Sequence, residues 1–260
     1  MKYKDIEGAG NLSGKMKGVI LAGGEGSRMA PFTEIINKFL LPVYDKILIE
    51  YSIYSLKNAG VVDIAIVLGK KSVGETINFL KDGTKYGVNI TYLYQSEALG
   101  MPNALYKAKE FVGKSNVVVL CADNIVSDNL KHILEEYRGG ALITCKKILD
   151  KGDLSKFSVF HFNEKGVPIN LIEKPKVPPS HTAFCGIQIY DCKVWGFIQK
   201  LKLSDRKEYE ITDIINEYIS IGEFHHIALE KPWFDCGTPD SLVKAQIHFY
   251  EESKRKEWYR

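Results

Sequence analysis

The sequence predicts an α/β protein with a Rossmann-like, mostly parallel sheet that is flanked by helices. Two observations support this class: short apolar runs alternate with longer amphipathic stretches, and each run is continuously apolar rather than alternating with polar residues. Strand-then-helix repetition is typical of a parallel sheet whose strands are buried on both faces. The 260 residues, 45% of them apolar, can bury a sizeable core, which excludes a disordered chain.

The first half of the chain contains four strand-and-helix pairs. Its apolar runs predict strands at 18–22, 64–68, 90–94 and 117–121. The amphipathic stretches that follow them predict helices at 48–59, 73–80, 103–112 and 130–137. The second half is richer in strands, at 141–145, 158–162, 169–173 and 184–190, with helices at 193–200, 211–221 and 241–253. We interpret this later part as a strand-rich lid over the sheet.

Composition and charge exclude several classes of protein. No apolar run approaches the roughly 20 residues of a membrane span, and residues 1–17 lack the apolar core of a secretory signal. With 35 Lys+Arg against 32 Asp+Glu, the formal charge of +3 gives no general attraction to nucleic acid. The five cysteines form no Cys-x-x-Cys pair, so we expect reduced, mostly buried thiols in a cytoplasmic protein. The adjacent His225 and His226 would point to opposite faces of a strand, and we expect them to be structural.

A glycine-rich segment, Leu21-Ala-Gly-Gly-Glu-Gly-Ser-Arg28, follows the first predicted strand. Loops after parallel strands face the ligand crevice of an open α/β sheet, and glycines let the backbone approach a phosphate or a base. A dinucleotide fingerprint starting at Gly24 would need glycine where Met29 stands, and no Gly-Lys-Ser/Thr triplet of a Walker loop follows. Arg28 and Lys38 add two cations that suit a triphosphate, although either alone could be a solvated surface charge.

Two aspartates follow apolar segments of the sequence. Asp123 comes just after the predicted strand at 117–121, and Asp235 lies in a short turn. Two carboxylates at a sheet edge are a usual way to hold Mg²⁺ beside phosphate oxygens. The residues alone leave a second interpretation open, in which Asp123 caps the following turn and Asp235 forms an Asx-turn toward Gly237.

Taken together, the motifs resemble the sugar nucleotidyltransferase family, in particular the short glucose-1-phosphate thymidylyltransferases. The resemblance runs from about residue 17 to residue 248 and rests on seven blocks in the family's order. They are segment 23–43 (Gly23-Gly-x-Gly-Ser-Arg28, Pro31, Thr33, Lys38 and Leu40-Leu-Pro-Val43), Gln95 to Gly100, Asp123-Asn-Ile125, Ile172-Glu-Lys-Pro175, Gly186 to Asp191, Glu210-Ile-Thr-Asp213 and Trp233-x-Asp-x-Gly-Thr238.

The resemblance implies a fold of the nucleotide-diphospho-sugar transferase type. Residues 1–15, which contain Gly8, Gly10 and Gly14, are predicted to be a flexible leader. Residues 16–260 are expected to form one nucleotidyltransferase domain, with nucleotide binding in about 16–125 and sugar binding, plus a C-terminal helix, in 126–260. The implied reaction is Mg²⁺-dependent, in-line attack of a sugar 1-phosphate on the α-phosphorus of a nucleoside triphosphate, with release of pyrophosphate.

The expected substrates are dTTP and glucose 1-phosphate or a related sugar, which would give a dTDP-sugar for polysaccharide biosynthesis. Two alternatives stay open: the same chemistry with UTP or CTP and another sugar, and a regulatory module that binds a nucleotide sugar without turnover. The partners are then two small substrates, without nucleic acid or membrane, and a homo-oligomer is compatible with the sequence.

The resemblance also assigns roles to individual residues. The catalytic set is Arg28, Lys38, Asp123 and Asp235, in which both aspartates ligate Mg²⁺ and both cations hold the triphosphate. The nucleotide-binding set is Leu21, Ala22, Gly23, Gly24, Gly26, Ser27, Gln95 and Gly100, with the Gln95 amide facing a pyrimidine edge. The sugar-phosphate set is Phe157, Ser158, Glu173, Lys174, Phe184, Arg206 and Trp233. In it, Lys174 and Arg206 clamp the phosphate, while Glu173 either accepts hydrogen bonds from the sugar or only pairs with Lys174.

Three departures from the family pattern gather on the sugar side. Phe157-Ser-Val159 stands where the family commonly has Tyr-Gly-Val, and Phe184-Cys-Gly186 where it often has Val-Thr-Gly. The family's Gly-x-Ala-Gln-Ala stretch has become Gly100-Met-Pro-Asn-Ala104. We therefore expect the chemistry to be retained and the sugar to differ from plain glucose.

Overall fold

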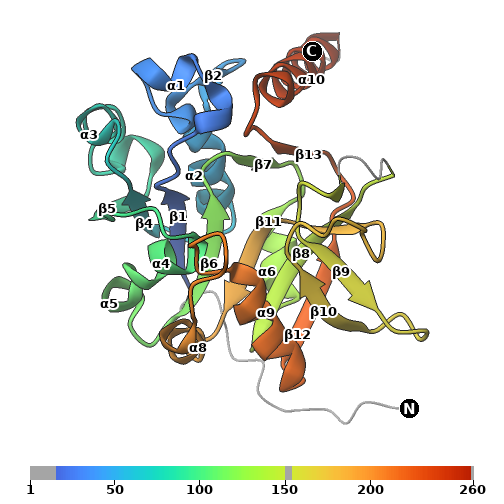
Figure 1. Cartoon of the computed structure of the whole chain (residues 1–260). Helices are drawn as coiled ribbons and strands as arrows, with labels where there is room; N and C mark the ends of the chain where they lie inside the picture. The colour runs from blue at the N-terminus through green and yellow to red at the C-terminus, as the bar shows by residue number, and fades with distance from the viewer. Residues whose placement is uncertain (1–15, 150–153, 259–260) are drawn as a thin grey trace.

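Nine strands form one sheet at the centre of the computed structural model (Figure 1). The structure describes residues 16–149 and 154–258, so the leader predicted at 1–15 lies outside the described residues. The strands of the sheet are β1 (Met16–Ala22), β4 (Asp63–Leu68), β5 (Asn89–Tyr94), β6 (Asn116–Cys121), β8 (Ala141–Lys147), β9 (Val159–Phe162), β10 (Pro168–Ile172), β11 (Thr182–Tyr190) and β12 (Phe224–Ala228). The α-helices are α1 (Phe32–Ile35), α2 (Leu48–Asn58), α3 (Val73–Leu80), α4 (Met101–Tyr106), α5 (Lys109–Val112), α6 (Leu130–Glu135), α8 (Val194–Lys200), α9 (Ile211–Ser220) and α10 (Pro239–Trp258).

Four strands make up the parallel part of the sheet, in the order β6-β1-β4-β5. In β1, Val19 is in register with Ala65 of β4 on one side and with Val119 of β6 on the other. Because these strands are parallel, their carboxyl ends meet along one edge of the sheet. This arrangement confirms the predicted α/β class.

The strand-rich second half was expected as a lid over the sheet, but it extends the sheet instead. β11 pairs antiparallel with β6 and β8, and β12 joins β8 in parallel. The register of β11 against β8 shifts between Phe184 and Gln188, where Gly186 has a φ of +62°. This irregularity lets the first residues of β11 reach β9, through Ala183 opposite Val159, and β10 pairs with β9 beyond it.

Both faces of the parallel strands are buried, as their continuously apolar sequences predict. Ile20, Ile66 and Leu120 point to a core cluster that includes residues of α2, α3 and α6. Val67 and Val119 point the other way, to a cluster that includes residues of α4, α5, α8 and α9. The alternation follows from the two-residue period of a strand, and helices on each face cover the apolar side chains.

The helix predicted at 103–112 is divided in two. α4 ends at Tyr106, after which the amides of Lys107 and Ala108 donate to carbonyls three residues back, and α5 begins at Lys109. Hydrogen bonds from an amide to the carbonyl three residues back tighten the last turn of a helix and end it. Apolar spacing alone could not show the break, because Leu105, Ala108 and Val112 still pack in the same cluster.

Two short ladders complete the chain. β7 (Asn124–Val126) pairs antiparallel with β13 (Trp233–Asp235), and β2 (Pro42–Val43) with β3 (Lys46–Ile47). Short 3₁₀ turns are η2 (Ser27–Met29), η3 (Lys38–Leu40) and η4 (Thr84–Tyr86). Within the two described ranges, no helix is both long enough and apolar enough to cross a bilayer.

The cysteines behave as the sequence predicts, whereas the structural role expected of His225 and His226 stays a prediction. All five thiols are unpaired, and only Cys192 is exposed. The ring of His226 packs against the rings of Phe160 and Phe162, where burial and the neighbouring His225 lower the pKa of its imidazole. Its packing is that of a structural side chain.

Candidate active site

The glycine-rich loop after β1 is held open by two side chains that follow it. Gly26 has a φ of +69°, a left-handed backbone that favours glycine. Thr33 Oγ1 donates to the Gly26 carbonyl at 2.8 Å, and Asn37 Nδ2 donates to the Gly24 carbonyl at 3.3 Å. Because these two hydrogen bonds fix the loop backbone, the loop keeps its shape and leaves the space beside it open.

Two other positions require glycine because a neighbouring group lies close to the backbone there. A Cβ on Gly23 would lie 1.9 Å from Nε2 of Gln95, so the Gln95 amide rests on the bare backbone. A Cβ on Gly100, whose φ is +95°, would lie 2.3 Å from the carbonyl oxygen of Tyr209. Glycine at these positions therefore lets three separate segments converge at the carboxyl edge of the sheet.

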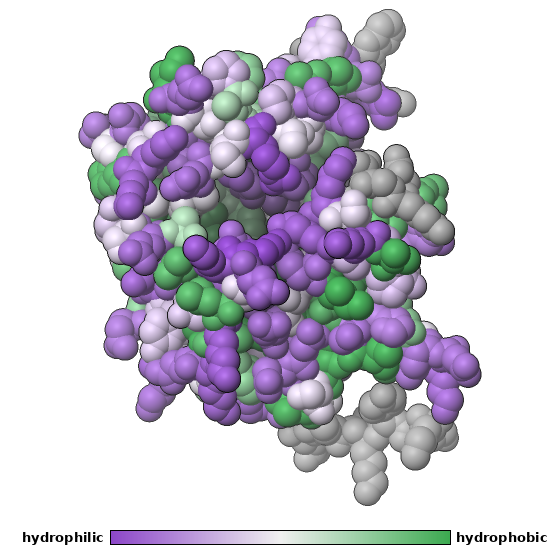
Figure 2. Space-filling view, in the orientation of Figure 1, coloured by the Kyte–Doolittle hydropathy of each residue, from purple (hydrophilic) through white to green (hydrophobic). Residues whose placement is uncertain are grey.

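A cavity of about 890 Å³ lies where these segments converge. Figure 2 shows a hollow in this face with hydrophilic residues gathered around its rim. The volume is in the range of small-molecule sites, roughly 300–1,000 Å³. Its lining includes all eight residues predicted for nucleotide binding and three of the four predicted as catalytic, namely Leu21, Ala22, Gly23, Gly24, Gly26, Ser27, Gln95, Gly100, Arg28, Lys38 and Asp123.

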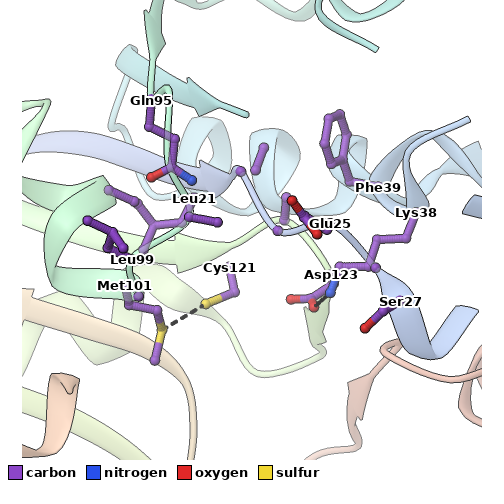
Figure 3. A pocket seen from close by; sticks show the side chains of 18 of the residues that line it. Leu21, Glu25, Ser27, Lys38, Phe39, Gln95, Leu99, Met101, Cys121 and Asp123 are labelled. Atoms are coloured by element: carbon purple, nitrogen blue, oxygen red, sulfur yellow. Dashed lines mark hydrogen bonds and ion pairs between the residues drawn. The ribbon is translucent and has the colours of Figure 1, made fainter. Parts of the chain in front are cut away.

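The two ends of the cavity differ in character (Figure 3). Gln95, Leu21 and Leu99 lie at one end, whereas Lys38 and Asp123 lie at the other. Gln95 is 4% exposed, and its Oε1 has no hydrogen-bond partner among the described residues. A buried amide oxygen without a partner suits a ligand that brings a donor.

At the charged end, Lys38 and Asp123 form a mostly buried ion pair. The Lys38 ammonium donates to Oδ2 of Asp123, and their side chains are 14% and 16% exposed. Burial alone would lower the pKa of Lys38, but the charge of Asp123 and the hydrogen bond outweigh it and raise that pKa. Burial likewise opposes ionisation of Asp123, and Lys38 overcomes it, so the pKa of Asp123 is lowered.

Asp235 joins this cluster from a distant part of the chain. The β7–β13 ladder places Asp235 opposite Asn124, next to Asp123. Burial and then the charge of Asp123 raise the pKa of Asp235 to about 6, against the opposing effects of Lys38 and Arg28. A Cβ on Gly237 would lie 2.9 Å from Arg28 Nη2 and 3.1 Å from Asp235 Oδ1. The four residues predicted as catalytic are thus close neighbours.

These carboxylates are the residues that could hold a divalent cation. No group of three or more His, Cys, Asp and Glu side chains with a metal-binding arrangement occurs in the described part of the chain. Two carboxylates nevertheless fit Mg²⁺, which keeps several waters and binds through one or two carboxylates together with phosphate oxygens. The raised pKa of Asp235 fits as well, because a cation would relieve the repulsion between the two carboxylates.

The predicted sugar-phosphate residues lie outside the lining of this cavity and are paired with one another. Ser158 Oγ donates to Glu173 Oε2, and the other carboxylate oxygen of Glu173 contacts Lys174 Nζ at 3.3 Å and Arg206 Nη1 at 3.0 Å. The ion pair with Lys174, one of the two expectations for Glu173, is therefore present. Arg206 also binds Glu208 and Glu210, so three carboxylates surround its guanidinium.

An aromatic pair borders this side of the site. The rings of Phe157 and Trp233 pack with centroids 5.2 Å apart. Phe184, two residues before Gly186 in the sequence, is buried. The Trp233 indole N–H donates to Asn124 Oδ1 at 2.7 Å. The sugar-side residues come from the 157–158 and 173–174 segments, from β11, from the 206 loop and from β13.

Sequence reasoning missed several residues of the cavity. Among them are Glu25, Phe39, Lys70, Glu97, Ala98, Leu99, Met101, Ala104, Cys121, Ala122 and Glu208. One signal could have found Lys70, because it follows β4, whose carboxyl end shares an edge with that of β1. Glu208 offered no such signal, since its place depends on the pairing with Arg206.

A family model described as nucleotidyl transferase matches residues 17–252. The chain belongs to this family. A glucose-1-phosphate thymidylyltransferase of Mycolicibacterium smegmatis is 35% identical over 237 residues, which cover 88% of this chain and 81% of the relative. A low-salt glycan biosynthesis nucleotidyltransferase of Haloferax volcanii is 35% identical over 242 residues, covering 93% and 68%.

Solved structures agree with this assignment. A Bacillus anthracis protein assigned as a glucose-1-phosphate thymidylyltransferase, crystallised with sucrose, is 40% identical to this nucleotidyltransferase, with a TM-score of 0.84 and coverage of 89% and 94%. A UDP-glucose pyrophosphorylase in complex with UDP-glucose, at 22% identity and a TM-score of 0.79, covers 91% of this chain and 99% of its own and shares the fold. The protein is a sugar nucleotidyltransferase that resembles glucose-1-phosphate thymidylyltransferases and takes a nucleotide and a sugar phosphate as substrates.

Proposed function

We propose that this nucleotidyltransferase joins dTTP to glucose 1-phosphate or a closely related sugar 1-phosphate. A phosphate oxygen of the sugar 1-phosphate bonds to the α-phosphorus of the triphosphate while the bond to the β-phosphate oxygen breaks, and pyrophosphate leaves in line. The observation that carries the proposal is the gathering of Arg28, Lys38 and Asp123 at one end of a cavity whose other end holds Gln95, with Asp235 beside them. The step needs little covalent help from side chains, since positioning and charge neutralisation drive it.

Arg28 and Lys38 would neutralise the triphosphate. Lys38 already lies in the cavity lining with its ammonium on Asp123. Binding of a phosphate oxygen would draw this ammonium partly away from the carboxylate, so that it can follow the charge that develops on the leaving pyrophosphate. Arg28 lies over Gly237 beside Asp235, where its planar guanidinium can bind two phosphate oxygens at once.

Asp123 and Asp235 would hold a Mg²⁺ ion. When bound, the ion supplies charge neutralisation at the phosphate oxygens. Support for this assignment comes from the donor set, which consists of two adjacent, mostly buried carboxylates. Asp123 would also keep its side chain in place between turnovers, since it stays bonded to Asn124 and Lys38.

Gln95 would read the nucleobase. Thymine and uracil present a ring N–H donor beside carbonyl acceptors, and a glutamine amide offers the complementary oxygen and nitrogen. The unpartnered Oε1 of Gln95 would accept the ring N–H. Similarity to several glucose-1-phosphate thymidylyltransferases supports dTTP, and UTP is the second candidate because the same edge occurs in uracil.

Between the two sugar options, the altered wall favours a sugar related to glucose over glucose itself. Ser158, which replaces the family's glycine, donates to Glu173 Oε2 and so occupies an acceptor that a sugar hydroxyl would otherwise use. The Phe157 ring adds an apolar surface where the family pattern has a phenolic hydroxyl. A sugar 1-phosphate with one hydroxyl fewer, or with a bulkier apolar substituent, would match this altered wall.

A pyrophosphate-release panel tests the proposal. It crosses dTTP, UTP, CTP, ATP and GTP with several sugar 1-phosphates, with and without Mg²⁺. We expect release with dTTP, and more weakly with UTP, only when Mg²⁺ is present. Nucleotide-sugar binding without pyrophosphate release from any pair would favour a non-catalytic module, and equal release without Mg²⁺ would contradict the metal assignment.

A further inference from the structure

The side chain of Asn124 bridges the charged end of the site and the aromatic wall. Its Nδ2 donates to Asp123 Oδ1 at 2.9 Å, and its Oδ1 accepts from the Trp233 indole N–H at 2.7 Å. We propose that Asn124 and the Trp233 N–H are positioning residues, which fix the Asp123 carboxylate for the cation and connect it to the wall beside the sugar. The inference rests on the proposed function, in which Asp123 ligates Mg²⁺ and Trp233 borders the sugar.

Chemistry fixes the direction of this bridge. An indole nitrogen can only donate a hydrogen bond, so the amide oxygen of Asn124 must face Trp233. The amide nitrogen then faces Asp123, whose ionised carboxylate can only accept. The usual ambiguity between the oxygen and nitrogen of an asparagine amide is therefore absent here. If Trp233 lost its N–H, only the bond to Asp123 would still orient the amide, so the amide would hold the carboxylate less firmly.

The backbone holds all three residues in one rigid unit. Trp233 is in register with Val126, and Asp235 with Asn124, in the β7–β13 ladder. The amide of Cys236 also donates to the Asp123 carbonyl at 2.9 Å. The hydrogen bond between Asn124 and Trp233 thus lies beside the β7–β13 ladder, which also positions Asp123 and Asp235.

The bridge is tightly packed on its far side as well. A Cβ on Gly186 of β11 would lie 3.0 Å from a Val126 methyl, 3.5 Å from Trp233 Nε1 and 3.6 Å from Asn124 Oδ1. The bare backbone of Gly186 therefore leaves room for the indole and the amide to meet. Little space remains for either side chain to adopt another rotamer.

Each oxygen of Asp123 then has a defined partner. Oδ1 accepts from Asn124 and Oδ2 from Lys38, so the carboxylate plane is set from both sides. The Trp233 ring packs on Phe157, so a ligand that moves this pair can shift the indole, the amide and finally the carboxylate. Partners that orient a metal ligand typically change metal affinity by about 10- to 100-fold when they are removed.

Mn²⁺ binding, measured by electron paramagnetic resonance with and without saturating dTTP, tests the bridge. The variants are Asn124→Leu, which keeps the shape of the amide, Trp233→Phe, which keeps an aromatic ring but loses the N–H, and the double variant. We expect the Mn²⁺ dissociation constant to rise about 10-fold in each single variant. Because the two groups act in series, the double variant should bind no more weakly than Asn124→Leu alone.

Two further variants separate the possible outcomes. Phe157→Leu removes the ring contact but leaves the N–H and the amide, and it should change Mn²⁺ affinity by less than about twofold. Asp123→Ala should abolish binding. Wild-type protein that binds Mn²⁺, with Asn124→Leu and Trp233→Phe within twofold of it, would overturn the bridge and leave the proposed function intact.

Wild-type protein that binds no Mn²⁺, either alone or together with dTTP, would overturn the metal assignment itself, and the bridge with it. Thermal unfolding followed by circular dichroism shows whether each variant is folded. If Asn124→Leu does not fold, Trp233→Phe alone decides: an unchanged Mn²⁺ affinity contradicts the bridge. If Trp233→Phe fails, Asn124→Leu decides in the same way.

Discussion

The proposed nucleotide end and the proposed sugar side of this enzyme differ in the kind of contacts that form them. At the nucleotide end, backbone segments with glycines at Gly23, Gly26 and Gly100 surround an open cavity. On the sugar side, side chains contact one another: Arg206 is surrounded by three carboxylates, and Glu173 accepts from Ser158. A binding site formed by close backbone contacts tolerates few substitutions. A site formed by paired side chains can change its substrate preference through single substitutions. The difference explains how the sugar preference can change while the phosphoryl chemistry stays the same.

The largest expected effect comes from the ion pair at the charged end. Replacement of Lys38 by Met should lower kcat by about 10²- to 10³-fold, because the charge that develops on the leaving pyrophosphate loses its donor. The variant should also unfold at a lower temperature, since Asp123 remains buried without its main counter-charge. Pyrophosphate release and thermal unfolding measure the two effects.

A second variant separates stability from catalysis. Lys38→Met combined with Asp123→Asn should regain much of the lost stability, because residue 123 no longer carries an uncompensated buried charge, but none of the activity. Lys114→Met, at an exposed lysine before β6, is the matched control and should leave both quantities near wild type. If Lys38→Met kept more than a tenth of the wild-type kcat, Lys38 would have only a structural role.

The next effect concerns the nucleotide end. In Gly23→Ala the new Cβ would meet Gln95 Nε2 at 1.9 Å, so the amide must leave its place and lose its contact with the base. We expect the KM for dTTP to rise about 10- to 100-fold, which corresponds to the loss of one or two buried hydrogen bonds. Gly74→Ala in α3, where a Cβ meets nothing within 4 Å, is the control and should leave KM unchanged. A rise in sugar-phosphate KM of equal size would show that the loop does not act through the base.

Much of the nucleotide end could be predicted from the sequence, because its determinants are local. Apolar runs gave the parallel strands, and parallel strands place their following loops at one edge, where the glycines and Asp123 then had to lie. The approach of Asp235 was predicted only through the family resemblance, since the β7–β13 pairing joins segments over a hundred residues apart. Steric complementarity, such as Gly23 against Gln95, is a property of packed atoms and has no sequence pattern of its own.

The sugar side could be predicted only as a set of residues. Its chain segments lead to strands that extend the sheet instead of covering it, because the irregularity at Gly186 in β11 redirects the pairing. The partners of Arg206 depend on how the loop around residues 204–210 folds, and the sequence does not show that Glu173, Glu208 and Glu210 would all bind it. Side-chain pairing of this kind follows from the tertiary structure.

The smallest effect expected is a change of sugar preference at Ser158. Ser158→Gly removes the hydroxyl that occupies Glu173 Oε2, so a sugar hydroxyl can take that acceptor. One hydrogen bond of about 1 kcal/mol corresponds to roughly a fivefold rise in kcat/KM for glucose 1-phosphate. Steady-state kinetics with several sugar 1-phosphates at saturating dTTP measure the change.

Ser158→Ala distinguishes the hydrogen bond from the space that glycine would open. Both variants free the carboxylate oxygen, but only Ser158→Gly also removes the Cβ; equal gains would attribute the preference to the acceptor, and a gain confined to glycine to steric room. The KM for dTTP should stay constant in both, since Ser158 does not line the nucleotide cavity. If glucose 1-phosphate were turned over equally by the wild type, by both variants and by Phe157→Tyr/Ser158→Gly, this wall would not select the sugar, and the contrast between the two ends of the site would fail.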